Sequence, residues 1–181
     1  MKEKDNEWQH SDSKDFRDWF YNNRKDEQTS RIVRYLKAWR DKRLFGYSSI
    51  ELTILGVENF YGYDNRDDLS LLYTLQNIKN ALQSKIVRKP VAPNENLWEE
   101  LPDKEKDKRI QQIETLYSDV KSAIDNASLQ RASTILIEQF GDRFPLLEDE
   151  KRIRLPFVIT QLVQNRGDYR KKHFIYSKTL P

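Results

Sequence analysis

The chain has 181 residues, which is enough for one domain with a core of its own. Its net charge of +3 is too weakly basic to indicate nucleic-acid binding by itself. Cysteine is absent, and the two histidines, His10 and His173, are far apart, so we expect no disulfide, no metal site and no Ser/His/Asp triad. The sequence has no signal peptide and no apolar run of about 18 residues, so a cytoplasmic protein without a membrane span is expected.

Few residues in the chain break helices. There are 5 glycines and 6 prolines, and aromatic residues make up 12% of the sequence, which argues against both a turn-rich β fold and a disordered chain. The sequence therefore predicts an all-α fold, with a bundle of about six helices over residues 1–145. Residues 146–181 are expected to form a C-terminal extension that packs on the bundle or is partly irregular.

The first two predicted helices span residues 12–26 and 28–44. The first places its aromatic side chains at helical spacing on one face. The second carries an apolar face next to an unusually basic stripe that includes Arg34 and Lys37. Gly46 follows it, where a left-handed residue commonly ends a helix.

The third predicted helix begins near Ser48 and extends to about residue 61. Ser48 and Glu51 have the spacing of a capping box, in which each side chain accepts a hydrogen bond from the backbone of the other residue. A fourth helix follows, capped by Asp67 or Asn65.

Two prolines keep the segment 85–97 extended, as a loop or a short strand. Pro102 begins a long helix that reaches about residue 127 and has a regular apolar stripe. Residues 128–140 form the last predicted helix, which ends at Gly141.

Four residues form a candidate phosphate site. Arg34 and Lys37 lie on the basic stripe, and Ser48 and Ser49 lie at the start of the following helix. A helix N-terminus offers unpaired N–H groups and a partial positive charge, while lysine adds a point charge and arginine a two-pronged donor. The plainer alternative is that Ser48 is only a helix cap and the two cations are only a solvated face.

Tyr47 lies next to this candidate site, in the loop before it. Its ring could stack on a nucleobase, an interaction that contributes about 1–3 kcal/mol. A plain packing role is the alternative. No residue is predicted to be catalytic or to bind a metal.

Five segments, in this order, resemble landmarks in the helical half of the cGAS/DncV-like nucleotidyltransferases (CD-NTases). They are residues 8–20 (WQHSDSKDFRDWF), 31–39 (RIVRYLKAW), 47–52 (YSSIEL), 91–97 (VAPNENL) and 140–145 (FGDRFP). The first segment has Ser13 where the family usually has proline, which loosens its register.

Members of that family are bacterial antiviral enzymes of CBASS systems. They join nucleoside triphosphates into cyclic or linear oligonucleotide second messengers, which switch on effector proteins. The resemblance implies a PAP/OAS-like helical substrate-binding lobe in which Lys37 and Ser49 contact the triphosphate of an ATP- or GTP-type donor. Ser48 replaces Ser49 if the register shifts by one.

The family's other lobe carries a Gly-Ser loop and carboxylates that hold two Mg²⁺ ions. This chain has no Gly-Ser pair, and only seven residues precede Trp8. The resemblance therefore covers the helical lobe alone. We expect the isolated chain to be inactive and Mg²⁺ to bind only together with a catalytic lobe, which is an expected partner alongside nucleoside triphosphates and a defence-system effector.

Two other interpretations stay open. The chain could be a non-catalytic relative that binds a nucleotide or a second messenger as a sensor. It could instead be a helical module that binds a protein through the charged face of the helix at 102–127.

Overall fold

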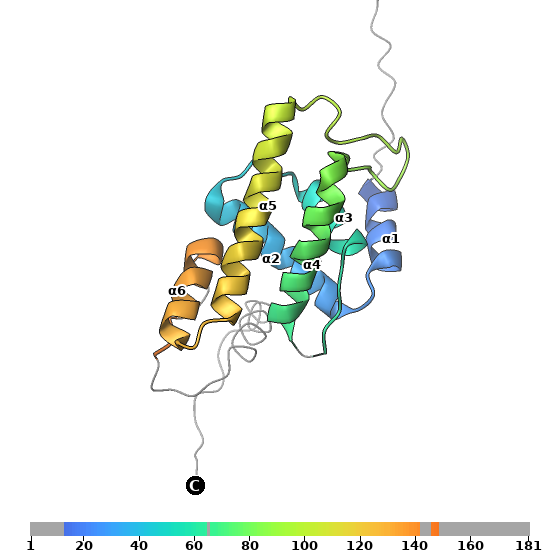
Figure 1. Cartoon of the computed structure of the whole chain (residues 1–181). Coiled ribbons are helices and arrows are strands. Elements are labelled where there is room, and N and C mark those ends of the chain that lie inside the picture. The colour runs from blue at the N-terminus through green and yellow to red at the C-terminus, as the bar shows by residue number, and fades with distance from the viewer. Residues whose placement is uncertain (1–12, 65, 142–145, 149–181) are drawn as a thin grey trace, which may run out of the picture.

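The computed structural model describes residues 13–64, 66–141 and 146–148. Within these residues the secondary structure consists of helices, without a β-strand, so the predicted all-α bundle of about six helices is confirmed (Figure 1). Residues 149–181 of the predicted extension lie outside the described residues. In the part of the chain that is described, no helix is long and apolar enough to span a membrane.

The helices pack as a bundle around α2. In chain order they are α1 (Ser13–Asn23), α2 (Glu27–Arg43), α3 (Ser49–Glu58), α4 (Asp67–Ala81), the 3-10 helix η1 (Leu82–Ser84), α5 (Asp103–Ile124) and α6 (Leu129–Phe140). α4 and α5 lie side by side, and α2 crosses behind them to contact α3, α4 and α6 (Figure 1). α1 lies against α3, on the side of the bundle opposite α6 (Figure 1).

The core is continuous from the helices into the loops. Trp39 of α2 and Trp98 of the loop before α5 are both fully buried. Tyr47, from the α2–α3 loop, lies between them, with ring centroids 5.9 Å from Trp39 and 6.3 Å from Trp98. Because large aromatic side chains dominate core energetics, these contacts anchor both loops to the bundle.

Two predicted helix ends are wrong in detail. The left-handed residue after α2 is Leu44, with φ of 54°, and not Gly46. α4 has Arg66 at its N-cap position without a side-chain cap, so Asp67 does not cap it. The Asp67 carboxylate is instead fully buried and pairs with Arg31 of α2 at 2.6 Å. This tertiary contact engages the side chain that would otherwise be available for capping.

Other local predictions are confirmed. Ser48 and Glu51 form the predicted capping box at the start of α3. The segment 85–97 is an extended loop with one isolated bridge between Arg88 and Asn96. α3 ends at Glu58, somewhat before the predicted end.

Candidate functional site

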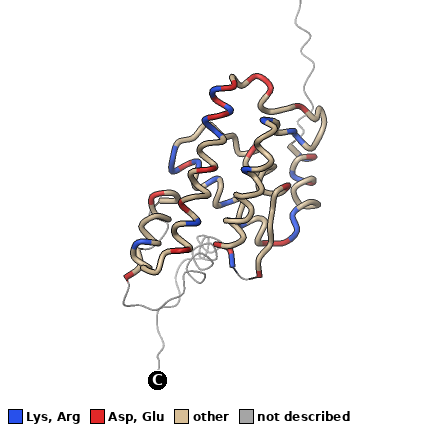
Figure 2. Tube along the Cα trace, in the orientation of Figure 1, with Lys and Arg blue, Asp and Glu red and all other residues tan. Residues whose placement is uncertain are grey.

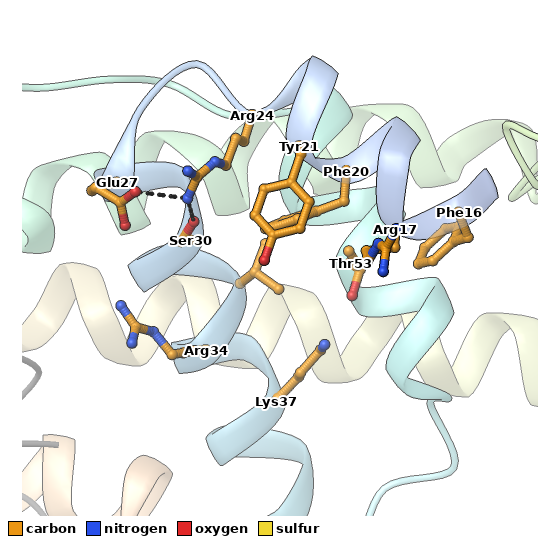
Figure 3. Close-up of a pocket in the computed structure, with 11 residues that line it drawn as sticks. Phe16, Arg17, Phe20, Tyr21, Arg24, Glu27, Ser30, Arg34, Lys37 and Thr53 are labelled. Carbon is orange, nitrogen blue, oxygen red and sulfur yellow. Dashed lines mark hydrogen bonds and ion pairs between the residues drawn. The ribbon is translucent and has the colours of Figure 1, made fainter. Parts of the chain in front are cut away.

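Charged residues of both signs are distributed over the whole bundle (Figure 2). A local excess of positive charge occurs where a pocket of about 440 Å³ opens between α1 and α2, with α3 contributing one residue (Figure 3). The residues that line it comprise four cations, one carboxylate, three aromatic rings and three smaller side chains: Arg17, Arg24, Arg34, Lys37, Glu27, Phe16, Phe20, Tyr21, Ser30, Val33 and Thr53. Such a lining suits an anion that also carries a flat or apolar part.

Lys37 enters the pocket from α2 and is half-buried (Figure 3). Burial lowers the pKa of its ammonium, the neighbouring Arg40 lowers it further, and Asp41 offsets part of this. Within the described residues, no carboxylate lies within ion-pair distance of Lys37. A partly desolvated cation without a counter-charge favours a bound anion.

The pocket's four cations differ in how they are compensated. Arg24 pairs with Glu27 at 2.7 Å and donates to the Ser30 hydroxyl at 3.1 Å. Arg17 pairs with the adjacent Asp18 at 3.0 Å. Arg34 and Lys37 have no ion-pair partner in the described part of the chain, so the two predicted cations are the uncompensated ones.

The two predicted serines lie at the edge of this site and do not line the pocket. The Ser48 hydroxyl accepts the Glu51 backbone N–H at 3.1 Å as the cap of α3. The Ser49 hydroxyl accepts a hydrogen bond from Arg40 Nη1 at 2.9 Å. The Thr53 hydroxyl, which does line the pocket, donates to the Ser49 carbonyl at 2.7 Å. Ser49 is therefore one helical turn from the pocket wall.

Arg40 and the pocket-lining residues of α1 are not among the site residues that the sequence predicts. Arg40 continues the stripe of Arg34 and Lys37 with the same three-residue spacing. Its charge lowers the pKa of Lys37, and its Nη1 donates to the Ser49 hydroxyl at the start of α3. Arg17 and Tyr21 of α1 and Arg24 just after its end have a spacing that indicates one helical face. Helical periodicity could have identified both groups.

Tyr47 does not lie where base stacking would place it. Its side chain is buried, and its hydroxyl donates to the Arg109 carbonyl at 2.7 Å. Burial raises the pKa of this phenol well above its usual value. Trp39 and Trp98 pack against the ring, so neither of its faces is open to a nucleobase in this structure. Tyr47 therefore has the packing role that the sequence left open as the alternative to base stacking.

A buried polar network holds the α2–α3 loop and the start of α3. Glu51 Oε1 accepts hydrogen bonds from Trp98 Nε1 and Arg109 Nη1, each at 2.6 Å, while its other oxygen accepts the Ser48 backbone N–H. Arg109 Nη2 also donates to the Gly46 carbonyl at 2.8 Å. Arg109 Nε makes no hydrogen bond among the described residues and lies 3.6 Å from Glu105 Oε1. The remaining hydrogen bonds of this buried network favour one geometry for the serine end of the site.

The described residues contain no group of three or more histidine, aspartate or glutamate side chains that could hold a metal ion. The buried Asp67 and Asp68 pair with Arg31 and Arg66 instead. Mg²⁺ therefore stays an expectation tied to a catalytic lobe.

Solved structures with a similar fold come from Vibrio cholerae. The di-nucleotide cyclase DncV in complex with GTP is 22% identical, with a TM-score of 0.67 over 79% of this chain and 40% of that one. The cyclic AMP-GMP synthase DncV in complex with the linear intermediate 5′ pppA(3′,5′)pG is 24% identical, with a TM-score of 0.61 over 80% of this chain and 40% of that one. The chain thus spans about 40% of the length of these structures.

The family match covers most of the bundle. The model for the family described as "Cyclic GMP-AMP synthase, C-terminal domain" matches residues 26–151, which include α2 to α6 and leave α1 before the match. Four of the five sequence landmarks fall within this match, and the first, residues 8–20, precedes it. The helical architecture agrees with the match as well. The chain therefore belongs to the family of cyclic GMP-AMP synthase C-terminal domains, the helical lobe of the cGAS/DncV-like nucleotidyltransferases.

Proposed function

We propose that this chain is the nucleotide-gripping helical lobe of a cytoplasmic bacterial antiviral nucleotidyltransferase of the CBASS type. Such an enzyme makes cyclic or linear oligonucleotide second messengers from nucleoside triphosphates. The DncV structures contain GTP, or ATP and GTP, or a linear intermediate, which supports nucleotides as ligands here. In this proposal the lobe comprises residues 1–145, and residues 146–181 are an extension to it.

The uncompensated pair Arg34 and Lys37 carries the proposal. A triphosphate would supply the counter-charge that these two side chains lack among the described residues, with arginine as a two-pronged donor and lysine as a point charge. Ser48 and Ser49 would hold the far end of the same triphosphate. Their hydroxyls and the N–H groups in the first turn of α3 are hydrogen-bond donors for an anion, and the helix N-terminus carries a partial positive charge. Arg40, which already donates to Ser49, also lies at this end, with its charge paired to Asp41 at 2.7 Å.

Binding of ATP and GTP, measured by isothermal titration calorimetry, tests this assignment. Lys37→Ala should weaken both nucleotides at least about tenfold, because a charge-assisted hydrogen bond contributes about 1.5–3 kcal/mol. Lys104→Ala removes an exposed lysine outside the pocket and serves as the matched control. Unchanged affinity in a folded Lys37→Ala protein would rule out the phosphate role.

We also propose that a nucleotidyltransferase lobe with Mg²⁺-binding carboxylates must complete the site before any polymerisation occurs. Incubation of the pure chain with Mg²⁺ and labelled ATP or GTP should give no oligonucleotide. A labelled product would contradict this part of the proposal. Co-purification of a protein with a Gly-Ser loop and an Asp-x-Asp motif would distinguish a lobe acting with a partner from a nucleotide sensor.

The protein-interaction alternative has less support. The charged first turns of α5 are engaged locally, with Lys106 paired to Asp103 and Lys108 paired to Glu105. Exposed pairs of this kind leave a solvated surface without a net charge that would attract a partner. If the wild-type chain bound no nucleotide, the protein-interaction alternative would be favoured over the nucleotide-binding proposal.

A further inference from the structure

The proposed phosphate site leaves the aromatic wall of the pocket without a role. This wall comes from α1, and its most accessible member is Tyr21, which is 57% exposed although its ring lines the pocket (Figure 3). Phe16 and Phe20 are half-buried, and Phe16 is stacked on Trp19 at 5.3 Å between ring centroids. Tyr21 is therefore the pocket's aromatic side chain with the most surface left for a ligand.

The Tyr21 ring is held in place on two sides. The Arg24 guanidinium lies 5.1 Å from the ring centroid, and Phe20 contacts the ring edge-to-face at 5.6 Å. Arg24 is itself fixed by Glu27 and by the Ser30 hydroxyl. A ring positioned in this way loses little conformational entropy when a ligand stacks on it, which favours binding.

We propose that Tyr21 stacks on the base of a nucleoside triphosphate whose phosphates lie at Lys37 and Arg34. The inference rests on the proposed function and assigns a base-contacting residue within that site. Tyr21, Arg34 and Lys37 line one pocket, and its volume of about 440 Å³ lies within the range of about 300–1,000 Å³ that is usual for small-molecule sites. Stacking tolerates any base, so Tyr21 should separate nucleotides from bare polyphosphate and not adenine from guanine.

Other tyrosines of the chain are placed less well for this role. Tyr47 is buried in the core. Tyr61, Tyr63 and Tyr73 are exposed, but they lie outside the pocket and contact one another, with Tyr73 5.0 Å from Tyr61 and 6.2 Å from Tyr63 between ring centroids. Tyr73 is thus a matched control, an exposed tyrosine at a site without the cations.

The test compares two probes, ATP and inorganic tripolyphosphate, by calorimetry on the full chain. Four proteins are measured: the wild type, Tyr21→Ala, Tyr21→Phe and Tyr73→Ala, with circular dichroism melting curves as a folding check. We expect Tyr21→Ala to weaken ATP at least about fivefold, the lower end of what base stacking contributes. Tripolyphosphate should change less than about twofold, and Tyr21→Phe, which keeps the ring, should behave as the wild type does.

The outcomes separate this inference from the proposed function. Unchanged ATP binding in Tyr21→Ala would overturn the base contact. Equal weakening of ATP and tripolyphosphate binding would overturn it too, because it would show that Tyr21 only positions Arg24. Wild-type affinity for tripolyphosphate equal to that for ATP would overturn it as well. All three results would leave the phosphate role of Lys37 standing, whereas failure of the wild type to bind either probe would remove both.

Discussion

Arg109 of α5 donates from its Nη1 atom to Oε1 of Glu51 on α3 across 2.6 Å, although the two residues are 58 positions apart in the sequence. Both side chains are buried. This ion pair ties the longest described helix to the turn that presents Ser48 and Ser49. The serine end of the proposed phosphate site therefore depends on contacts made by the opposite half of the chain.

Replacement of Glu51 by alanine should strongly destabilise the bundle. It removes the acceptor for Trp98 and leaves the Arg109 guanidinium buried without its carboxylate, a loss that typically costs about 3–5 kcal/mol. Urea titration of the wild type and the variant gives the difference in their free energies of unfolding. Glu99→Ala, at an exposed position, should change it by less than about 0.5 kcal/mol. A loss below about 1 kcal/mol for Glu51→Ala would show that the network is not a main contributor.

Asp67 should be comparably important for joining α2 to α4. Its fully buried carboxylate accepts two hydrogen bonds from Arg31, at 2.6 and 2.9 Å, and one from Gln28 at 2.9 Å. Asp67→Ala should lower the free energy of unfolding by about 3–5 kcal/mol, because it leaves the Arg31 cation without its carboxylate and removes one of the two hydrogen bonds of the Gln28 amide nitrogen. The exposed Asp64 nearby provides the control, and equal effects of the two alanine variants in urea titration would contradict the prediction.

Gly56 sets how closely α2 and α3 approach. A Cβ atom at this position would lie 2.8 Å from Val33 Cγ2 and 3.2 Å from Leu36 Cδ1. Gly56→Ala should therefore destabilise the protein by about 1–3 kcal/mol, despite the better helix propensity of alanine. At Gly62 the nearest atom is 3.4 Å from an added Cβ, so Gly62→Ala is the control. A thermal midpoint that rises in Gly56→Ala would show that α2 can move away without cost.

ATP affinity should depend on pH through Lys37. Burial and Arg40 lower the pKa of Lys37 in the folded protein below its ordinary value of 10.5. Only the protonated amine attracts phosphate, so affinity should be retained near neutral pH and lost as the pH rises through this lowered pKa. Lys37→Arg keeps its charge throughout this range. Calorimetry across the alkaline range should therefore show a steeper fall for the wild type, and parallel curves would contradict the assignment.

Helix positions and one cap could be predicted because they depend on near neighbours. Apolar periodicity located the six α-helices of the described residues, and the Ser48–Glu51 pair marked the start of α3 through a three-residue spacing. The basic stripe of α2 put Arg34 and Lys37 on one face for the same reason, since residues three apart share a helix face, and both line the same pocket. These interactions are encoded within one or two helical turns.

The errors involve partners that are distant in sequence. Asp67 looked like a helix cap because the sequence does not show that Arg31, 36 positions earlier, faces it in the core. For Tyr47 the sequence left base stacking and packing both open, because its burial depends on Trp98 from a loop about fifty residues later. The sequence by itself determined an all-α lobe with a basic stripe on its second helix. For residues 13–64, 66–141 and 146–148, the tertiary structure decided which pocket cations lack a counter-charge and that Tyr21 lines the pocket, because burial and charge compensation depend on how separate helices pack together.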